Sequence, residues 1–287
     1  MSEKILLCTD LDRTLIPNGP QAESPRAREF FHRVCASEHL TLAYVSGRHQ
    51  ALVEEAIAEY SLPQPDYVVG DVGTTIYRVE AGNDWRHLTE WDESIGGDWA
   101  GNGHADLAAL LAGIGELQLQ EESKQNRYKL SYYLPLQADR EGIIAEMNSR
   151  LQSAGVNATL VWSVDEAVGT GLLDVLPAGA TKLHAVEFLI QALGFSRANT
   201  VFSGDSGNDM PVLVSPVHAV LVNNAAPEVR EEAISEARAQ SNSDTLYIAQ
   251  GDYLEMNGNY SAGILEGLAH YHPQWMRAVL ETTAAGD

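Results

Sequence analysis

The sequence predicts an α/β fold, with a Rossmann-like core of parallel strands and a smaller α+β domain inserted into it. Strand-like and helix-like segments alternate from the N-terminus, the alternation loosens over 81–104, and the strand–helix rhythm returns from residue 180. Such βαβ alternation is typical of a parallel sheet covered by helices on both faces. We therefore expect a core formed by 1–84 and 179–287, and an inserted domain at 85–178.

The first part of the expected core opens with the apolar run "KILLCT" at 4–9. A continuous apolar run is typical of a strand that is buried on both faces. We expect a helix over 25–37, with Ser24 as its N-cap and Pro25 at its first helical position. The next expected segments are a strand at 41–46, a helix at 50–60, a strand at 66–70 and a hairpin arm at 74–79.

The expected insertion has a different pattern. Residues 81–104 contain three tryptophans and several glycines without a clear period. Tryptophans of an insertion could stack on a ligand, although a large aromatic ring in a small domain more often belongs to its core. The insertion continues with expected strands at 128–134, 158–163 and 172–176 and a helix at 140–154. The alternation that follows it comprises 180–193, 200–203, 209–214, 218–222, 227–239 and 261–272.

The charge of the chain restricts its partners. There are 18 Lys and Arg residues against 40 Asp and Glu residues, which gives a formal net charge of −22. Such a surface repels nucleic acids and anionic membranes, so we expect neither as a partner. An anionic substrate would need local positive charge at its site. Cys8 and Cys35 have no metal-ligand spacing and cannot form a disulfide framework, and we expect a cytoplasmic protein.

Polar clusters follow several expected strands at the point where each strand ends. In open α/β sheets, ligands bind outside the carboxyl ends of the strands. We therefore expect these clusters to meet at one edge of the sheet. They are Asp10 and Asp12 after 4–9, Ser46 at the end of 41–46, Lys182 at the start of the helix 180–193, and Asp205 and Asp209 after 200–203.

The residue types in these clusters suit phosphoryl transfer. Two carboxylates as close as Asp10 and Asp12 repel each other unless a cation compensates them. Carboxylate and carbonyl oxygens are typical Mg²⁺ ligands, whereas a hydroxyl, a lysine and backbone N–H groups bind phosphate. One carboxylate can attack a phosphoryl group, and a second can transfer the protons. Each cluster alone is also compatible with an ordinary turn or helix cap; their occurrence together favours a site.

These motifs resemble those of a known superfamily. D-x-D-x-T, Ser-Gly after the second strand, a lone lysine and G-D-x-x-x-D are similar to the four motifs of haloacid dehalogenase-like phosphatases, over essentially the whole chain. Finer matches resemble the sucrose-phosphate phosphatase family: "DLDRT", "AYVSGR", "DVGTTIY", "QNRYKLSYYL", "DVLP", "FSGDSGND" and "SAGILEGLAHY". In that superfamily the insertion is a cap that closes over the substrate.

The resemblance implies a role for each matching residue. Asp10 would be the nucleophile and Asp12 the general acid/base. Asp10, the carbonyl of Asp12 and Asp205 would bind Mg²⁺, with Asp209 and Ser206 nearby. The implied phosphate-binding residues are Ser46, Gly47, Lys182 and Asn208. The implied substrate contacts are Arg48, Gly73, Thr74 and Thr75 on the core and Gln125, Asn126, Lys129 and Asp174 on the cap.

Two departures from the family pattern bear on specificity. Arg13 replaces a small or amide residue, and the loop "VDEAVGTGLL" at 164–173 lacks the lysine that sucrose-phosphate phosphatases usually carry there. The resemblance implies a Mg²⁺-dependent phosphatase of sucrose 6-phosphate. The alternatives are a phosphatase of mannosylfructose phosphate or another sugar phosphate, a phosphotransferase, and a non-catalytic partner of a sugar-phosphate synthase.

Overall fold

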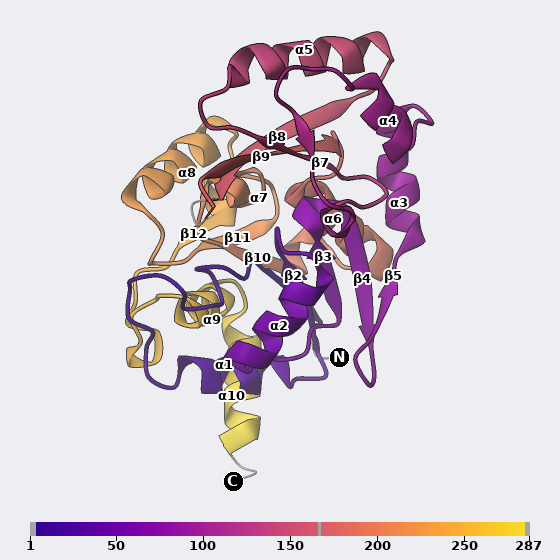
Figure 1. Cartoon of the computed structure of the whole chain (residues 1–287). Helices are drawn as coiled ribbons and strands as arrows, with labels where there is room; N and C mark the ends of the chain where they lie inside the picture. The colour runs from indigo at the N-terminus through magenta and orange to yellow at the C-terminus, as the bar shows by residue number, and fades with distance from the viewer. Residues whose placement is uncertain (1–3, 166–167, 285–287) are drawn as a thin grey trace. The chain divides into compact units, whose positions relative to one another are not determined.

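The computed structural model describes residues 4–165 and 168–284, which form two compact units (Figure 1). The first unit contains the chain up to His87 and again from Lys182, and the second is Leu88–Thr181. The second unit begins and ends three residues later than the expected insertion at 85–178. Of the loop at 164–173, residues 166 and 167 lie outside the described part of the chain.

The first unit is built on a largely parallel sheet, which confirms the expected fold class. Its strands are β1 (Ile5–Thr9), β2 (Leu40–Val45), β3 (Tyr67–Gly70), β4 (Thr75–Glu80), β5 (Asp84–His87), β10 (Thr200–Gly204), β11 (His218–Leu221) and β12 (Leu246–Ile248). They lie in the order β12-β11-β10-β1-β2-β3-β4-β5. The pairs from β12 to β3 are parallel, whereas β4 and β5 are antiparallel additions at one edge. Strand β1 therefore lies between β10 and β2.

Helices pack on this sheet. They are α1 (Ala27–Cys35), α2 (Gln50–Tyr60), α6 (Lys182–Leu193), α7 (Met210–Leu213), α8 (Pro227–Ala239), α9 (Ser261–Tyr271) and α10 (Pro273–Ala284). Every residue of β1 is buried, as its apolar run predicts. Phe31 of α1, Val53 of α2 and Leu265 of α9 belong to one hydrophobic core together with Leu7 of β1. None of the described helices combines the length and apolarity needed to cross a bilayer.

The expected start of the first helix is wrong. Helix α1 begins at Ala27, and the residue before it, Arg26, has a φ of 65° and makes no capping hydrogen bond with its side chain. The hydroxyl of Ser24 instead accepts a hydrogen bond from the backbone N–H of Asn257 at 2.8 Å. A contact with a residue far along the chain therefore replaces the local cap that the sequence predicts.

The second unit contains an antiparallel sheet covered by helices. Its strands, in the order β6-β7-β9-β8, are β6 (Gln118–Leu119), β7 (Leu130–Leu134), β9 (Thr170–Pro177) and β8 (Ala158–Asp165). Its helices are α3 (Thr89–Gly96), α4 (His104–Leu110) and α5 (Arg140–Ser153). Leu107 of α4 and Met147 of α5 pack with β7 and β9. Trp91 and Trp99 are almost fully buried, and Trp99 belongs to the hydrophobic core of the unit.

Candidate active site

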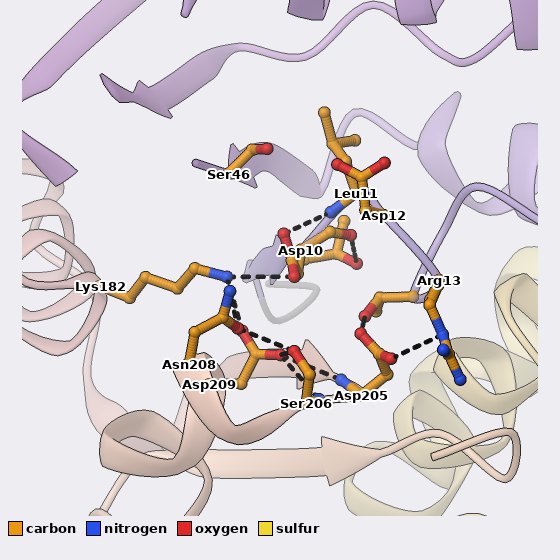
Figure 2. Close-up of polar contacts among 12 residues, drawn as sticks. Asp10, Leu11, Asp12, Arg13, Ser46, Lys182, Asp205, Ser206, Asn208 and Asp209 are labelled. Atoms are coloured by element: carbon orange, nitrogen blue, oxygen red, sulfur yellow. Dashed lines mark hydrogen bonds and ion pairs between the residues drawn. The ribbon is translucent and has the colours of Figure 1, made fainter. Parts of the chain in front are cut away.

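The strand order brings the sequence motifs of the first unit together. Asp10 follows β1, Ser46 follows β2 and Asp205 follows β10, and these three parallel strands are neighbours. Lys182 is the first residue of α6 and reaches the same place, as Figure 2 shows. The four motifs therefore converge at the carboxyl edge of the sheet, where parallel α/β sheets bind ligands.

Asp10 is a buried carboxylate in contact with a cation. It is 4 % exposed. Its Oδ2 lies 3.1 Å from Nζ of Lys182, and its Oδ1 accepts a hydrogen bond from the backbone N–H of Leu11 at 2.8 Å. Burial raises the pKa of Asp10 to about 7, against the opposing effect of Lys182. The group is therefore held in place by Lys182 while it is poorly hydrated, which suits a nucleophile.

Lys182 joins Asp10 to a second buried carboxylate. Its Nζ lies 2.7 Å from Oδ1 of Asp209 and donates a longer bond of 3.4 Å to Oδ1 of Asn208. Burial alone would lower the pKa of Lys182, but Asp10 and Asp209 raise it above its usual value. The ammonium group stays charged at neutral pH and supplies the local positive field that an acidic protein needs to bind an anion.

Asp209 fixes the loop that carries Asp205. Its Oδ2 accepts hydrogen bonds from the backbone N–H groups of Asp205 at 3.1 Å and Ser206 at 3.2 Å. A Cβ atom at Gly204 would lie only 2.5 Å from Cγ of Asp209. Glycine is therefore required at position 204, because the fully buried Asp209 packs directly against the end of β10.

Asp12 has a different environment. Arg48 donates two hydrogen bonds to its carboxylate, at 2.8 and 2.7 Å, and Asn18 donates a third at 2.7 Å. Burial opposes ionisation, but these bonds and the charge of Arg48 lower the pKa of Asp12 below its ordinary value. The side chain is 43 % exposed, at the rim of the site. Arg48, expected to contact substrate, orients Asp12 in this structure.

Three carboxylates are close enough to share a cation. One oxygen each from Asp10, Asp205 and Asp209 lies within 4.8 Å of the others, and all three residues are buried. Burial and the nearby Asp209 raise the pKa of Asp205 to about 6. Crowded carboxylates resist ionisation unless a cation compensates their charge, and their oxygens are the hard donors that Mg²⁺ prefers. The group therefore fits a Mg²⁺ ion. The carboxylate of Asp12 is not a member of this group.

A cavity of about 440 Å³ opens over these residues. This volume lies in the range of small-molecule sites. Among its lining residues are Asp10, Asp12, Ser46, Gly47, Arg48, Asp205, Ser206 and Asn208. Thr74 and Thr75 do not line it. The hydroxyl of Thr74 donates to the backbone oxygen of Asp71, and that of Thr75 donates to the Asp71 carboxylate. Gly73 likewise lies outside the lining of this cavity.

The expected cap contacts lie in the second unit, where several bind one another. Nζ of Lys129 lies 4.0 Å from Oδ2 of Asp174, whose Oδ1 accepts a hydrogen bond from the hydroxyl of Ser131. Oδ1 of Asn126 accepts the backbone N–H of Tyr128 at 2.9 Å. Their contact with a sugar stays a prediction.

Gln125 is held by bonds within the second unit. Its Oε1 accepts the backbone N–H of Ser131 at 2.7 Å and contacts a ring nitrogen of His104 at 3.1 Å. Its Nε2 donates to the backbone oxygens of Gln120 and Ser131 at 3.0 and 2.9 Å. The side-chain amide thus joins the start of β7 to the preceding loop.

Replacing Gln125 by leucine should therefore destabilise the protein. We expect a loss of about 1–3 kcal/mol in the free energy of unfolding, because backbone groups that Gln125 satisfies lose their partners. Thermal or urea unfolding measures this loss. The control is Gln152→Leu on the exposed side of α5. Unaltered stability together with a raised KM for substrate would assign Gln125 to sugar binding instead.

The sequence motifs gave no role to two residues that act on the site. Thr14, the last residue of D-x-D-x-T, donates its hydroxyl to Oδ1 of Asp205 at 3.1 Å. Asn18 binds both the carboxylate of Asp12 and the backbone N–H of Arg13. For Thr14, its position inside D-x-D-x-T is a sequence signal from which this role could have been predicted. Asn18 carries no such signal, because its partners are set by the loop conformation.

Comparison with known proteins shows what the chain is similar to. The family model of sucrose-6F-phosphate phosphohydrolase matches residues 3–272. A protein of Nitrosococcus oceani with the general description HAD-like hydrolase is 52 % identical, over 99 % of this chain and 77 % of that protein. The mannosylfructose-phosphate phosphatase of Agrobacterium fabrum is 30 % identical, over 93 % of this chain and 96 % of that protein.

A solved structure shows the same fold. The sucrose-phosphatase of Synechocystis, in complex with sucrose and phosphate, aligns with 94 % of this chain and 98 % of its own. The TM-score is 0.68 and the sequence identity is 27 %. The likeness therefore extends over both units of the chain.

Proposed function

Because the chain belongs to the sucrose-6F-phosphate phosphohydrolase family, and is thus a phosphoric monoester hydrolase of the sugar-phosphate type, we propose that it hydrolyses sucrose 6-phosphate in a Mg²⁺-dependent reaction. The observation that carries the proposal is the contact of buried Asp10 with Lys182 beneath a cavity that Asp12, Ser46 and Asp205 also line. The likeness to a sucrose-phosphatase supports the choice of sugar.

The proposed reaction has two halves. Against the effect of burial, Arg48 lowers the pKa of Asp12 in the substrate-free site, but the negative charge of a bound phosphate ester would favour its protonated form. An oxygen of Asp10 attacks phosphorus and forms an aspartyl-phosphate, while the bond from phosphorus to the sugar oxygen breaks and protonated Asp12 gives that oxygen its proton. Water then attacks phosphorus and gives its proton to Asp12, which releases phosphate and restores Asp10. Lys182, Ser46 and Asn208 hold phosphoryl oxygens during both steps. A Mg²⁺ ion held by Asp10, Asp205 and the carbonyl of Asp12, with Asp209 nearby, would neutralise phosphoryl charge.

Mannosylfructose phosphate is a second candidate substrate. The mannosylfructose-phosphate phosphatase of Agrobacterium fabrum matches almost its full length at 30 % identity. The loop at 164–173 also lacks the lysine expected of a sucrose-specific enzyme. A synthase that delivers the sugar phosphate remains a proposed partner. The close grouping of Asp10, Asp205 and Asp209 with Lys182 favours a catalytic role for this chain over a purely binding role in such a complex.

A panel of sugar phosphates tests this proposal. With Mg²⁺ present, we expect sucrose 6-phosphate to release phosphate with a kcat/KM at least about tenfold above glucose 6-phosphate and fructose 6-phosphate, a margin that a few extra sugar contacts supply. Faster turnover of mannosylfructose phosphate would select the second candidate. Transfer of phosphate to added sucrose instead of water would identify a phosphotransferase. No release from any ester would contradict the proposed function.

A further inference from the structure

Arg13 is fixed beside the candidate metal site by its backbone. Its φ of 59° is left-handed, a conformation that few residues other than glycine and asparagine adopt readily. Its N–H donates to Oδ1 of Asn18 at 2.8 Å, and its carbonyl accepts from Nδ2 of Asn224 at 2.6 Å. Asn224 is 2 % exposed and is itself bonded to the backbone N–H of Tyr260. The fold therefore holds the backbone of Arg13 in one conformation.

The side chain of Arg13 faces one carboxylate of the site. Its Nε lies 3.4 Å from Oδ2 of Asp205. The contact is an ion pair without hydrogen-bond geometry, and among the described residues this buried Nε finds no hydrogen-bond partner. Figure 2 shows Arg13 on the side of Asp205 away from Lys182. Arg13 therefore acts on Asp205 mainly through its positive charge and not through a directed hydrogen bond.

We propose that Arg13 is a built-in counter-cation that weakens the binding of a divalent cation by competing with it for Asp205. This inference rests on the magnesium site of the proposed function. In their ionised forms, the three carboxylates Asp10, Asp205 and Asp209 face two cations, Lys182 and Arg13, which leaves one net negative charge. Without Arg13 the cluster would carry two, which complements a divalent cation.

The expected size of the effect follows from solvent exposure. The side chain of Asp205 is 5 % exposed, but that of Arg13 is 43 % exposed. Water therefore screens the repulsion between Arg13 and a bound cation, although less than at an open surface. We expect removal of the charge to tighten Mg²⁺ binding about tenfold, which corresponds to about 1.4 kcal/mol.

Arg13→Asn is the decisive variant, because asparagine tolerates the left-handed backbone. Mg²⁺ binding to the substrate-free protein is measured by calorimetry and by the rise in melting temperature with Mg²⁺ concentration. We expect the Kd to fall about tenfold and the metal-free protein to melt at a lower temperature. Arg13→Lys, which keeps the charge, should stay within about threefold of the original Kd.

Arg26→Asn is the matched control. Arg26 also has a left-handed backbone, with φ 65°, and its ion pair at 2.9 Å is with exposed Glu29 at the start of α1. This variant should leave the Kd for Mg²⁺ unchanged. Unchanged or weaker Mg²⁺ binding by Arg13→Asn would overturn the inference alone, as would equal tightening by Arg13→Lys. Absence of Mg²⁺ binding by the unmodified protein would overturn the magnesium site and this inference with it.

Discussion

Asp10→Asn is expected to reduce kcat by about four orders of magnitude or more while the protein keeps its fold. An amide cannot form the acyl phosphate, so the covalent route is lost and only the effect of binding remains. The fold should persist, because asparagine has the same shape and its Oδ1 can still accept from the backbone N–H of Leu11. Lys182 also keeps its ion pair with Asp209. Phosphate release and thermal unfolding, measured in parallel, check both expectations.

Asp66→Asn provides the matched control for this variant. Asp66 precedes β3 and accepts a hydrogen bond from the backbone N–H of Leu42 at 2.8 Å, a bond that asparagine can also accept. It lies at the amino ends of the parallel strands, at the opposite edge of the sheet from Asp10. Its replacement should leave kcat within about twofold. Asp10→Asn retaining a tenth of the activity would exclude Asp10 as nucleophile.

The sequence predicts both the fold class and the side chains that the fold brings together, and the two predictions have the same basis. Asp10, Ser46 and Asp205 each follow an apolar run, and parallel strands place all such ends at one edge. Because parallel strands all point the same way, motifs that are distant along the chain lie close together in the fold. The same reasoning does not reveal the partner of a side chain. Arg48 binds Asp12 because two loops meet, and no local pattern encodes that meeting.

Other differences arise where distant contacts replace local signals. Ser24 has the sequence signature of a cap, yet it binds Asn257. Residues 81–104 show no helical period, although they contain β5, α3 and the buried Trp91 and Trp99. In a small unit, a large ring such as that of Trp99 can supply much of the interior, so regular spacing of apolar residues is not needed. Periodicity alone therefore misses short elements of this kind.

Lys182→Met is expected to lower the free energy of unfolding of the metal-free protein by about 3–5 kcal/mol, besides impairing catalysis. Lys182 is 9 % exposed and lies between Asp10 and Asp209, at 3.1 and 2.7 Å. Methionine keeps the apolar stem but leaves two buried carboxylates facing each other without a counter-charge. In a chain of this size the loss corresponds to a drop of about 10 °C in Tm.

Added Mg²⁺ should reverse part of this loss, because a divalent cation among Asp10, Asp205 and Asp209 replaces the missing positive charge. The recovery should exceed the stabilisation that Mg²⁺ gives the unmodified protein. Lys124→Met, at an exposed position of the second unit, should not change Tm. If Lys182→Met melts like the unmodified protein without metal, then the charge of Lys182 does not offset a cost of burying Asp10 and Asp209. In that case, the ion cluster would not be what holds the nucleophile in place.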